Sequence, residues 1–450
     1  MYFSRHAAAV FATASLFATP AFAQSGDDIA ALRRDMETLR HDYEARIGEL
    51  ETRLAQAEAD AAAAHAAVDA QATATDDSIA TVEQALSPSG PANNVNTNIY
   101  NPGISVALNG FLTAARNQTG DEQIAGFAAG DEIGRPAEGF SLGESEISFA
   151  ANIDPFLAGF VAFSVSREDE IGLEEAYIRT TALPGGVTLK AGRFLSGIGY
   201  LNERHAHDWS FSDAPLPYRA FLNAQLGDDG VQLRWIAPTA IYLEFGGEAL
   251  RGEAYPASGG ANDGVGAYSA FVRTGSDINV SSSWLAGASY LHTEALDRES
   301  NGDLFNGQSD LAILSLIYKW APGGNPLVRN LTLVGEYFAG EDDGDFNGLP
   351  LNQSHTGWYV QGVYQFMPRW SAGVRYAALD SEAPGALFAG TSLDDLGHQP
   401  FDITALLEFD TSEFGRLRLQ YARDEAGVDP NDVLTLQYTV IYGPHGAHRY

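Results

Sequence analysis

Residues 358–366 have the sequence WYVQGVYQF, in which the character of the side chains alternates with a period of two. One set consists of apolar or aromatic residues and one glycine, and its members are Trp358, Val360, Gly362, Tyr364 and Phe366. The other set is mostly polar, and its members are Tyr359, Gln361, Val363 and Gln365. Successive side chains of a β-strand point to opposite faces. This stretch therefore predicts a strand with one apolar face and one polar face.

The same alternation recurs through residues 104–450, for example at 331–338 and 416–421. A soluble β-sandwich would alternate in the same way, so two further features decide the class of sheet. The strands are about 10 residues long or more, which is the length that a tilted membrane strand requires. Aromatic residues gather at strand ends, where the interface girdles of a membrane barrel lie. These aromatic residues are Trp358, Phe366, Trp370, Tyr376, Tyr318 and Trp320. The features together predict an all-β, transmembrane antiparallel barrel.

The rhythm of the connections predicts about sixteen strands, an even number as in bacterial barrels. Every second connection is short, as at 154–155, 183–186, 237–238, 367–368 and 411–413. The intervening connections are long and acidic, and they are residues 117–141, 195–227, 251–264, 294–308, 341–354 and 381–398. Short periplasmic turns that alternate with long external loops place both chain ends in the periplasm. A count of about 14 or 18 remains an alternative, because 275–283 and 321–328 are long for periplasmic turns.

The residues before the barrel predict three segments. Arg5 and His6 precede an apolar run that ends in Ala21-Phe22-Ala23, so residues 1–23 form a signal peptide. Residues 24–86 carry a seam with steps of three and four, which begins Ile29, Leu32, Met36, Leu39 and Tyr43. The seam predicts a periplasmic α-helical coiled coil, with a single solvated Ala-rich helix as the alternative. Residues 87–103 are rich in Pro, Gly, Ser and Asn and predict a linker, so the barrel occupies residues 104–450.

Composition excludes several classes of function. The net charge is −33, which makes nucleic acid an implausible partner. The chain has no cysteine, so it has neither a disulfide nor a thiolate nucleophile. Residues 139–143 match the GxSxG pattern of hydrolases, but that pattern requires a strand-to-helix elbow and here it leads into a strand. We therefore predict that the chain is not an enzyme.

Charged side chains fall on the polar faces of the predicted strands. They are Glu175, Arg179, Lys190, Arg193, Glu336, Arg375, Arg416 and Arg418. An interior lined with opposed charges implies water inside, and about sixteen strands are wide enough for an aqueous channel. The alternative is a lumen closed by salt-bridged side chains and loops.

A weak metal candidate lies in the connection 195–227. Glu203, His205 and His207 have alternating spacing there. Neutral imidazoles with a carboxylate are ligands for zinc or another borderline metal. The alternative is a hydrogen-bonded loop, since no fourth ligand is evident and loop spacing fixes no geometry. No other cofactor is predicted.

Four segments carry a resemblance to a known group, and they are residues 139–155, 173–209, 227–238 and 443–450. They resemble proteobacterial porin-like outer-membrane proteins, a group often labelled zinc-regulated TonB-dependent outer membrane receptor and similar in design to phosphate-selective porins. The resemblance covers most of residues 100–450. It implies an outer-membrane porin of a Gram-negative bacterium, in which the connection 195–227 narrows the channel.

The leading hypothesis is therefore a water-filled channel for passive diffusion of small solutes or ions. The expected partners are outer-membrane lipid and lipopolysaccharide, the transported solutes, and two further copies of the chain in a homotrimer. Two alternatives from other classes remain. One is an outer-membrane receptor for uptake of zinc or another metal, and the other is an envelope tether with a closed barrel.

Overall fold

The computed structural model describes Glu37 and residues 102–117, 123–131, 133–136, 138–143, 145–165, 171–257 and 264–443. The chain divides into two compact units, residues 1–83 and 84–450. Within the first unit only Glu37 is described, and it is helical. The predicted signal peptide, coiled coil and linker therefore lie outside the described residues, apart from Glu37 and the last two linker residues.

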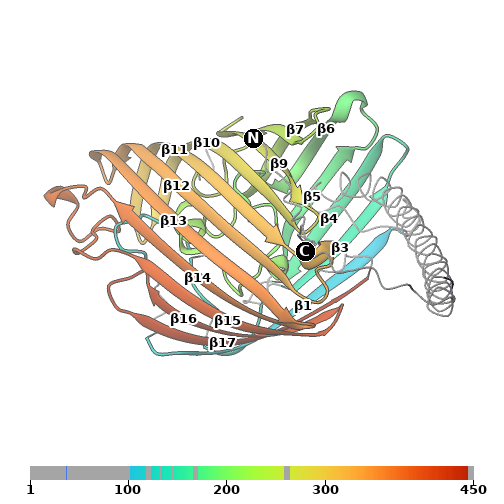
Figure 1. The fold of residues 1–450 in the computed structure, drawn as a ribbon. Helices are drawn as coiled ribbons and strands as arrows, with labels where there is room; N and C mark the ends of the chain where they lie inside the picture. Colours follow the sequence, from blue (N-terminus) through green and yellow to red (C-terminus); the bar gives the residue numbers. More distant parts are fainter. Residues whose placement is uncertain are drawn as a thin grey trace, which may run out of the picture. The chain divides into compact units, whose positions relative to one another are not determined.

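Seventeen antiparallel strand segments form one closed sheet (Figure 1). They are β1 (Gly103–Ala115), β2 (Gly139–Leu142), β3 (Ser145–Asn152), β4 (Leu157–Val165), β5 (Ile171–Thr180), β6 (Val187–Leu195), β7 (Gly227–Ile236), β8 (Tyr242–Leu250), β9 (Ala267–Asn279), β10 (Ser282–Ser300), β11 (Asp303–Trp320), β12 (Asn330–Phe346), β13 (Leu349–Met367), β14 (Trp370–Ser381), β15 (Phe401–Ser412), β16 (Gly415–Glu425) and β17 (Asn431–Tyr442). β1 pairs with β17 over Val106 to Ala115, which closes the ring.

The number of strands follows from the pairing of β2 and β3. Both pair with β1, β2 beside its later half and β3 beside its earlier half. They are thus two parts of one strand, interrupted after Leu142. The described barrel therefore has sixteen strands, and the predicted count is confirmed. The GxSxG residues 139–143 form β2 and the break after it, as the strand prediction expected.

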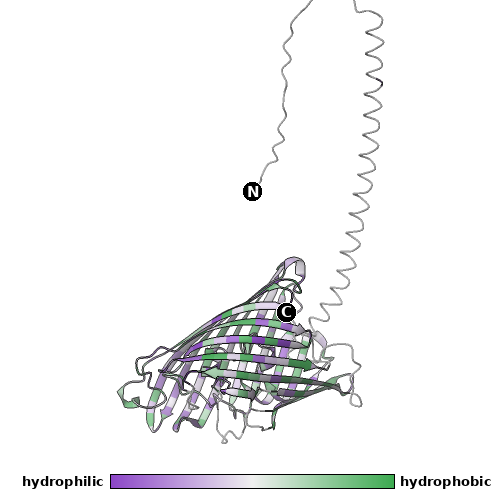
Figure 2. Ribbon diagram, turned by 90° about the horizontal axis from the view of Figure 1, so that it is seen from below, coloured by the Kyte–Doolittle hydropathy of each residue, from purple (hydrophilic) through white to green (hydrophobic). Residues whose placement is uncertain are grey.

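The alternation of the sequence becomes the two faces of the barrel wall (Figure 2). On β13, Trp358, Val360 and Tyr364 are exposed on the outer face, whereas Tyr359 and Gln361 are buried inside. Each strand thus directs apolar side chains outward and many polar ones inward, as lipid outside and a polar interior require. None of the helices in the described part of the chain is long and apolar enough to span a membrane.

Short connections lie at one end of the barrel and long connections lie at the other end. Two of the predicted long loops are exceptions. The predicted loops 294–308 and 341–354 are instead continuous hairpins, in which β10 turns into β11 and β12 into β13. The turns are Asn301-Gly302 and Asn347-Gly348, and all four residues have positive φ. Asn-Gly favours this two-residue turn, so the acidic residues around it belong to strands.

The connection between β6 and β7 lies inside the ring, where Figure 1 shows it in green. It contains a 3-10 turn, η2 (Ala206–Asp208), and a short helix, α2 (Leu216–Leu222), all of whose residues are buried. Three other 3-10 turns lie in connections: η1 (Pro184–Gly186), η3 (Pro322–Gly324) and η4 (Ala386–Phe388). The largest buried cluster joins this connection to the inner wall and includes Tyr218, Phe221, Phe338 and Tyr359. The core of the protein therefore sits inside the barrel.

Candidate functional site

The candidate functional site is the lumen together with the connection 195–227, which we call the lumen loop. Helix α2 has a proline at its start, and its C-cap residue Asn223 is left-handed with φ of 50°, a conformation that asparagine tolerates. The helix is too short to be stable alone, so contacts with the wall must hold it. Residues 195–227 thus lie inside the barrel, and their role as the constriction of a channel stays a prediction.

One anchor of the lumen loop is the predicted lumen residue Glu336 on β12. Its carboxylate accepts hydrogen bonds from the hydroxyl of Tyr218 at 2.9 Å and from the backbone N–H of Tyr200 at 2.8 Å, both in the lumen loop. It also accepts bonds from the wall residues Ser315 and Tyr359, each at 2.6 Å. Burial and the Glu336 charge raise the pKa of Tyr218 well above its usual value, so this hydroxyl stays a donor.

Three predicted lumen arginines form a second set of anchors. Arg375 donates to the carbonyl and to the carboxylate of Asp213, each at 2.8 Å. Arg418 donates to the carbonyl of Trp209 at 3.0 Å, and Arg416 donates to the carbonyl of His207. Arg375 is only 1% exposed and Arg418 is 0% exposed. Their guanidinium groups therefore bind the lumen loop and do not line open water in this structure.

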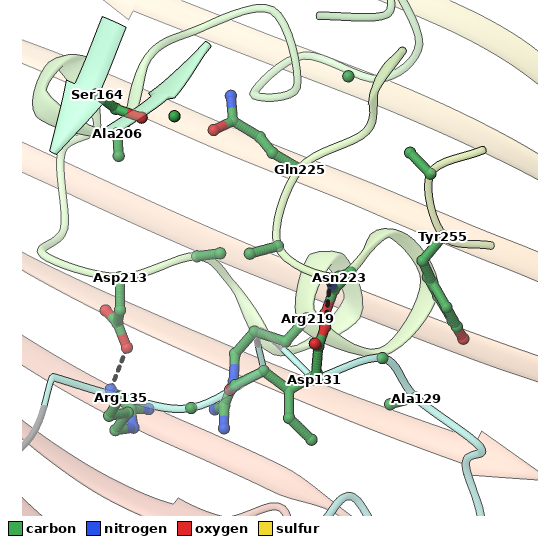
Figure 3. Close-up of a pocket in the computed structure, with 18 of the residues that line it drawn as sticks. Ala129, Asp131, Arg135, Ser164, Ala206, Asp213, Arg219, Asn223, Gln225 and Tyr255 are labelled. Carbon is green, nitrogen blue, oxygen red and sulfur yellow. Dashed lines mark hydrogen bonds and ion pairs between the residues drawn. The ribbon is translucent and has the colours of Figure 1, made fainter. Parts of the chain in front are cut away.

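A further segment that the sequence did not place inside the barrel supports the lumen loop. Arg135, from the connection between β1 and β2, pairs with Asp213 of the lumen loop (Figure 3). It also pairs with the wall residues Asp402 and Asp424. Arg219 of α2 also pairs with Asp424, at 2.9 Å. Burial alone would raise the pKa of Asp213, but the charges of Arg135 and Arg375 outweigh it and hold this pKa below its usual value.

The other four predicted lumen residues divide into two groups. Glu175 and Lys190 are buried on the inner face, where Glu175 accepts the N–H of Leu195 at 3.1 Å. Arg179 is half-buried and registers with Lys190 across β5 and β6. Arg193 lies three residues after Lys190 on β6 and is among the residues that line the cavity above the lumen loop. Its side chain is 40% exposed and pairs with Asp229 at 2.8 Å.

The two histidines of the metal candidate lie together, but their acidic neighbour is not Glu203. Glu203 pairs with Arg234 and Arg273 of the wall. Among the described residues, the group with metal-ligand spacing is instead Glu146, His205 and His207. Burial disfavours a charged His205, but Glu174 and Glu146 outweigh that effect and raise its pKa well above the usual value.

A cavity of about 1780 Å³ lies above the lumen loop, toward the end with the long connections. Figure 3 shows Ser164 and Ala206 at one side of it and Asp131 and Tyr255 at the other. Its lining includes eight acidic residues and three arginines. The acidic residues are Asp131, Glu138, Glu174, Asp213, Asp228, Glu253, Asp297 and Glu299, and the arginines are Arg135, Arg193 and Arg219. The excess of carboxylates favours cations over anions in this cavity.

Sequence reasoning missed Glu146, Arg135, Asp213 and Asp402. Alternation along β3 puts Glu146 on the same face as the buried Ser148, so its inward orientation was available from the pattern. Asp402 likewise alternates with Thr404 on β15. No comparable signal exists for Arg135 and Asp213, because both lie in irregular connections.

The comparisons with known proteins agree with this architecture. No protein-family model matches the chain. A loop L8 deletion mutant of OmpT, an outer membrane protein of Vibrio cholerae, has a TM-score of 0.50 at 12% identity, with 76% of this chain and 99% of that chain covered. An anion-selective porin from Comamonas acidovorans has a TM-score of 0.51 at 9% identity, with the same coverage of 76% and 99%. At these identities the likeness concerns the fold.

A closer relative is known by sequence. An uncharacterised protein of Aquifex aeolicus (strain VF5) is 31% identical over 338 residues, with 69% of this chain and 70% of that protein covered. The chain therefore belongs to the same family as this Aquifex aeolicus protein, and its barrel has the sixteen-stranded fold of outer-membrane porins.

Proposed function

We propose that the protein is an outer-membrane porin that passes small solutes or ions by diffusion, with the lumen loop as its constriction. The observation that carries the proposal is the lumen loop itself, which is fixed inside a closed barrel of sixteen strands by Glu336, Arg375 and Arg418. A barrel of this size encloses an aqueous lumen unless an inserted element narrows it. The polar inner face and the apolar outer face support a water-filled pore in lipid.

The direct test is single-channel conductance of the refolded full chain in a planar bilayer under a salt gradient. We expect discrete open steps and a reversal potential that indicates a preference for cations, because carboxylates outnumber arginines in the cavity. The variant with Asp131→Asn and Glu138→Gln should move the reversal potential toward zero. Glu413→Gln, in the short turn between β15 and β16, is the matched control. A reversal potential that is the same in all three proteins would refute the role of the cavity in selectivity.

A second candidate is a closed barrel that tethers the envelope. The near-complete burial of Arg375 and Arg418 favours it, because these side chains leave no open space between the lumen loop and the wall at their level. Persistent absence of conductance from a correctly folded barrel would support this candidate. The tether would act through the predicted coiled coil of residues 24–86, so deletion of that segment should then weaken the envelope without any effect on conductance.

The receptor label of the resembling group suggests energised uptake of a metal. Transporters of that kind have about 22 strands around a plug domain, which is more than the sixteen strands here. Passive diffusion is therefore the simpler function for this barrel. We also propose a homotrimer, for which the predicted seam of residues 24–86 offers a means of association. Lipopolysaccharide would then surround the long connections.

If the barrel lies in a membrane, a charged side chain on its outer face should reduce the stability of the fold, and the loss should grow with depth in the bilayer. Leu316 is 60% exposed on the outer face of β11. Leu316→Arg should destabilise the barrel by about 2–4 kcal/mol, because arginine is poorly solvated at the bilayer midplane. Val280→Arg, in the turn between β9 and β10, is the control and should cost about 0–1 kcal/mol. Urea unfolding in lipid vesicles measures both, and equal costs would contradict a membrane at the level of Leu316.

A further inference from the structure

Three carboxylates converge on one buried imidazole where the lumen loop meets β3 and β5. Nδ1 of His205 lies 2.8 Å from Glu146 Oε2 and 3.0 Å from Glu174 Oε1. Nε2 of the same ring lies 3.0 Å from Glu175 Oε2. The side chain of His205 is 5% exposed, and those of Glu146 and Glu175 are 4% and 2% exposed. Even a protonated His205 leaves an excess of negative charge here, and buried charge of one sign is costly unless a cation neutralises it.

His207 completes a ligand set of the kind that transition metals prefer. Nδ1 of His207 lies 3.6 Å from Glu146 Oε2, and one ligand atom from each of Glu146, His205 and His207 lies within 4.8 Å of the others. A tetrahedral ion with bonds of about 2.0–2.1 Å holds its ligand atoms about 3.3 Å apart. The separations of 2.8 and 3.6 Å bracket that value. Two imidazoles with a carboxylate suit zinc and similar borderline metals better than calcium or magnesium.

The hydrogen bonds around His205 also suit a metal ligand. Nδ1 makes no hydrogen bond of good geometry among the described residues, although two carboxylate oxygens lie near it. Nε2 is within hydrogen-bond distance of Glu175. A metal ion that binds here displaces the Nδ1 proton, and the ring then donates Nε2–H to Glu175 while its Nδ1 lone pair points to the ion beside Glu146 and Glu174. Histidine ligands of metals commonly have such a carboxylate behind them, which fixes the tautomer and strengthens the ligand.

A β-bulge in β5 brings the side chain of Glu174 next to His205. The register between β4 and β5 shifts between Ala162 and Phe163, so that Glu174 has no partner on β4. A bulge redirects the side chain of its extra residue, and here Glu174 and Glu175 both reach His205. Glu174 also lines the acidic cavity, as does Ala206 between the two histidines (Figure 3). A hydrated cation that enters the cavity therefore reaches the cluster directly.

We propose that Glu146, His205 and His207, with Glu174 as the fourth ligand, bind one divalent transition metal ion of the zinc class. The site joins the lumen loop to two strands of the wall, since the histidines belong to the loop and the glutamates to β3 and β5. A bound ion therefore fixes the lumen loop at this point. Binding is independent of transport, but its effect on conductance rests on the proposed porin function.

The test of binding uses the refolded full chain, stripped with a chelator and titrated with Zn²⁺ by calorimetry, with Co²⁺ as a spectroscopic probe. We expect one saturable site per chain and the intense visible absorption of four-coordinate Co²⁺. His205→Ala and His207→Ala should each abolish this signal, and Glu175→Gln should weaken affinity about 10–100-fold. His292→Ala with His398→Ala is the matched control and should bind as the parent does. Glu146→Gln is nearly isosteric and covers the case in which a histidine variant fails to fold.

Absence of saturable binding, or binding that survives in Glu146→Gln and in the folded histidine variants, would overturn the proposal. Conductance with and without Zn²⁺ is measured separately on the same preparations. We expect Zn²⁺ to reduce fluctuations of the open channel in the parent protein and to leave those of His207→Ala unchanged. Zn²⁺ binding without any conductance would support the site and count against the porin. Conductance without Zn²⁺ binding would support the porin and count against the site.

Discussion

Replacement of Arg375 by alanine should raise the open probability of the channel by about two orders of magnitude. Arg375 makes two hydrogen bonds to Asp213, and both groups are buried. Removal of one partner from a buried ion pair costs about 3–5 kcal/mol, and each 1.4 kcal/mol is about a factor of ten in population. That cost falls on the state in which the lumen loop contacts the wall. The population in which the loop has left β14 therefore increases.

The measurement is single-channel recording of matched preparations of the parent protein and three variants. Arg375→Met retains most of the side-chain volume, so a gain in conductance by this variant separates the loss of the ion pair from the loss of packing. Arg369→Ala is the control, since Arg369 is exposed in the turn before β14 and donates to the carbonyls of Asp410 and Thr411 at the end of β15. Open probabilities that are equal in Arg375→Ala, Arg369→Ala and the parent protein would contradict the constriction role of the lumen loop.

The barrel wall could be predicted closely from the sequence, because each strand position has one of two environments. On β13 the alternation of apolar and polar residues corresponds directly to the exposed Val360 and the buried Gln361. Alternation alone does not account for Arg193, which lies three residues after Lys190 and still lines the cavity in the lumen. The hairpins at Asn301 and Asn347 were predictable too, but their charged flanks resembled loops.

The interior could be predicted only in part, because its contacts join elements that are far apart in the chain. The sequence predicted that His205 and His207 act together, since both lie in the lumen loop. It paired them with Glu203, two residues away, whereas the structure pairs them with Glu146 on β3. In irregular backbone, neighbours in sequence need not share a direction. The pairing of Arg135 with Asp402 is more remote still and has no local signature.

Arg135→Ala should cause the largest loss of stability among single substitutions in the lumen. Arg135 is 2% exposed and pairs with Asp213, Asp402 and Asp424. Among the described residues, its removal leaves three buried carboxylates whose ion pairs with Arg219 and Arg375 remain. Loss of one partner from a single buried pair already costs about 3–5 kcal/mol, and here three pairs share the lost cation. Arg135→Lys keeps the charge with fewer donors, so an intermediate loss is expected.

The contribution of Asp213 to the pH dependence of stability should also change sign between the parent protein and Arg135→Ala. In the parent protein the pKa of Asp213 is lower than in the unfolded chain, so its contribution to stability exists above the unfolded pKa and is lost as the pH falls. Without Arg135, burial becomes the stronger influence and should raise this pKa above the unfolded value. The folded variant then binds more protons than the unfolded chain. Its stability should therefore rise as the pH falls from about 7 to about 5.

Urea unfolding in detergent micelles at several pH values measures this difference. Arg251→Ala is the control, because Arg251 and its partner Glu253 are both about half exposed and their pair contributes little. Arg251→Ala should follow the parent protein at every pH. If Arg135→Ala instead loses stability on acidification in parallel with the parent, burial does not dominate the Asp213 carboxyl in the variant. The network around Arg135 would then not be the electrostatic anchor that holds the lumen loop against β15 and β16.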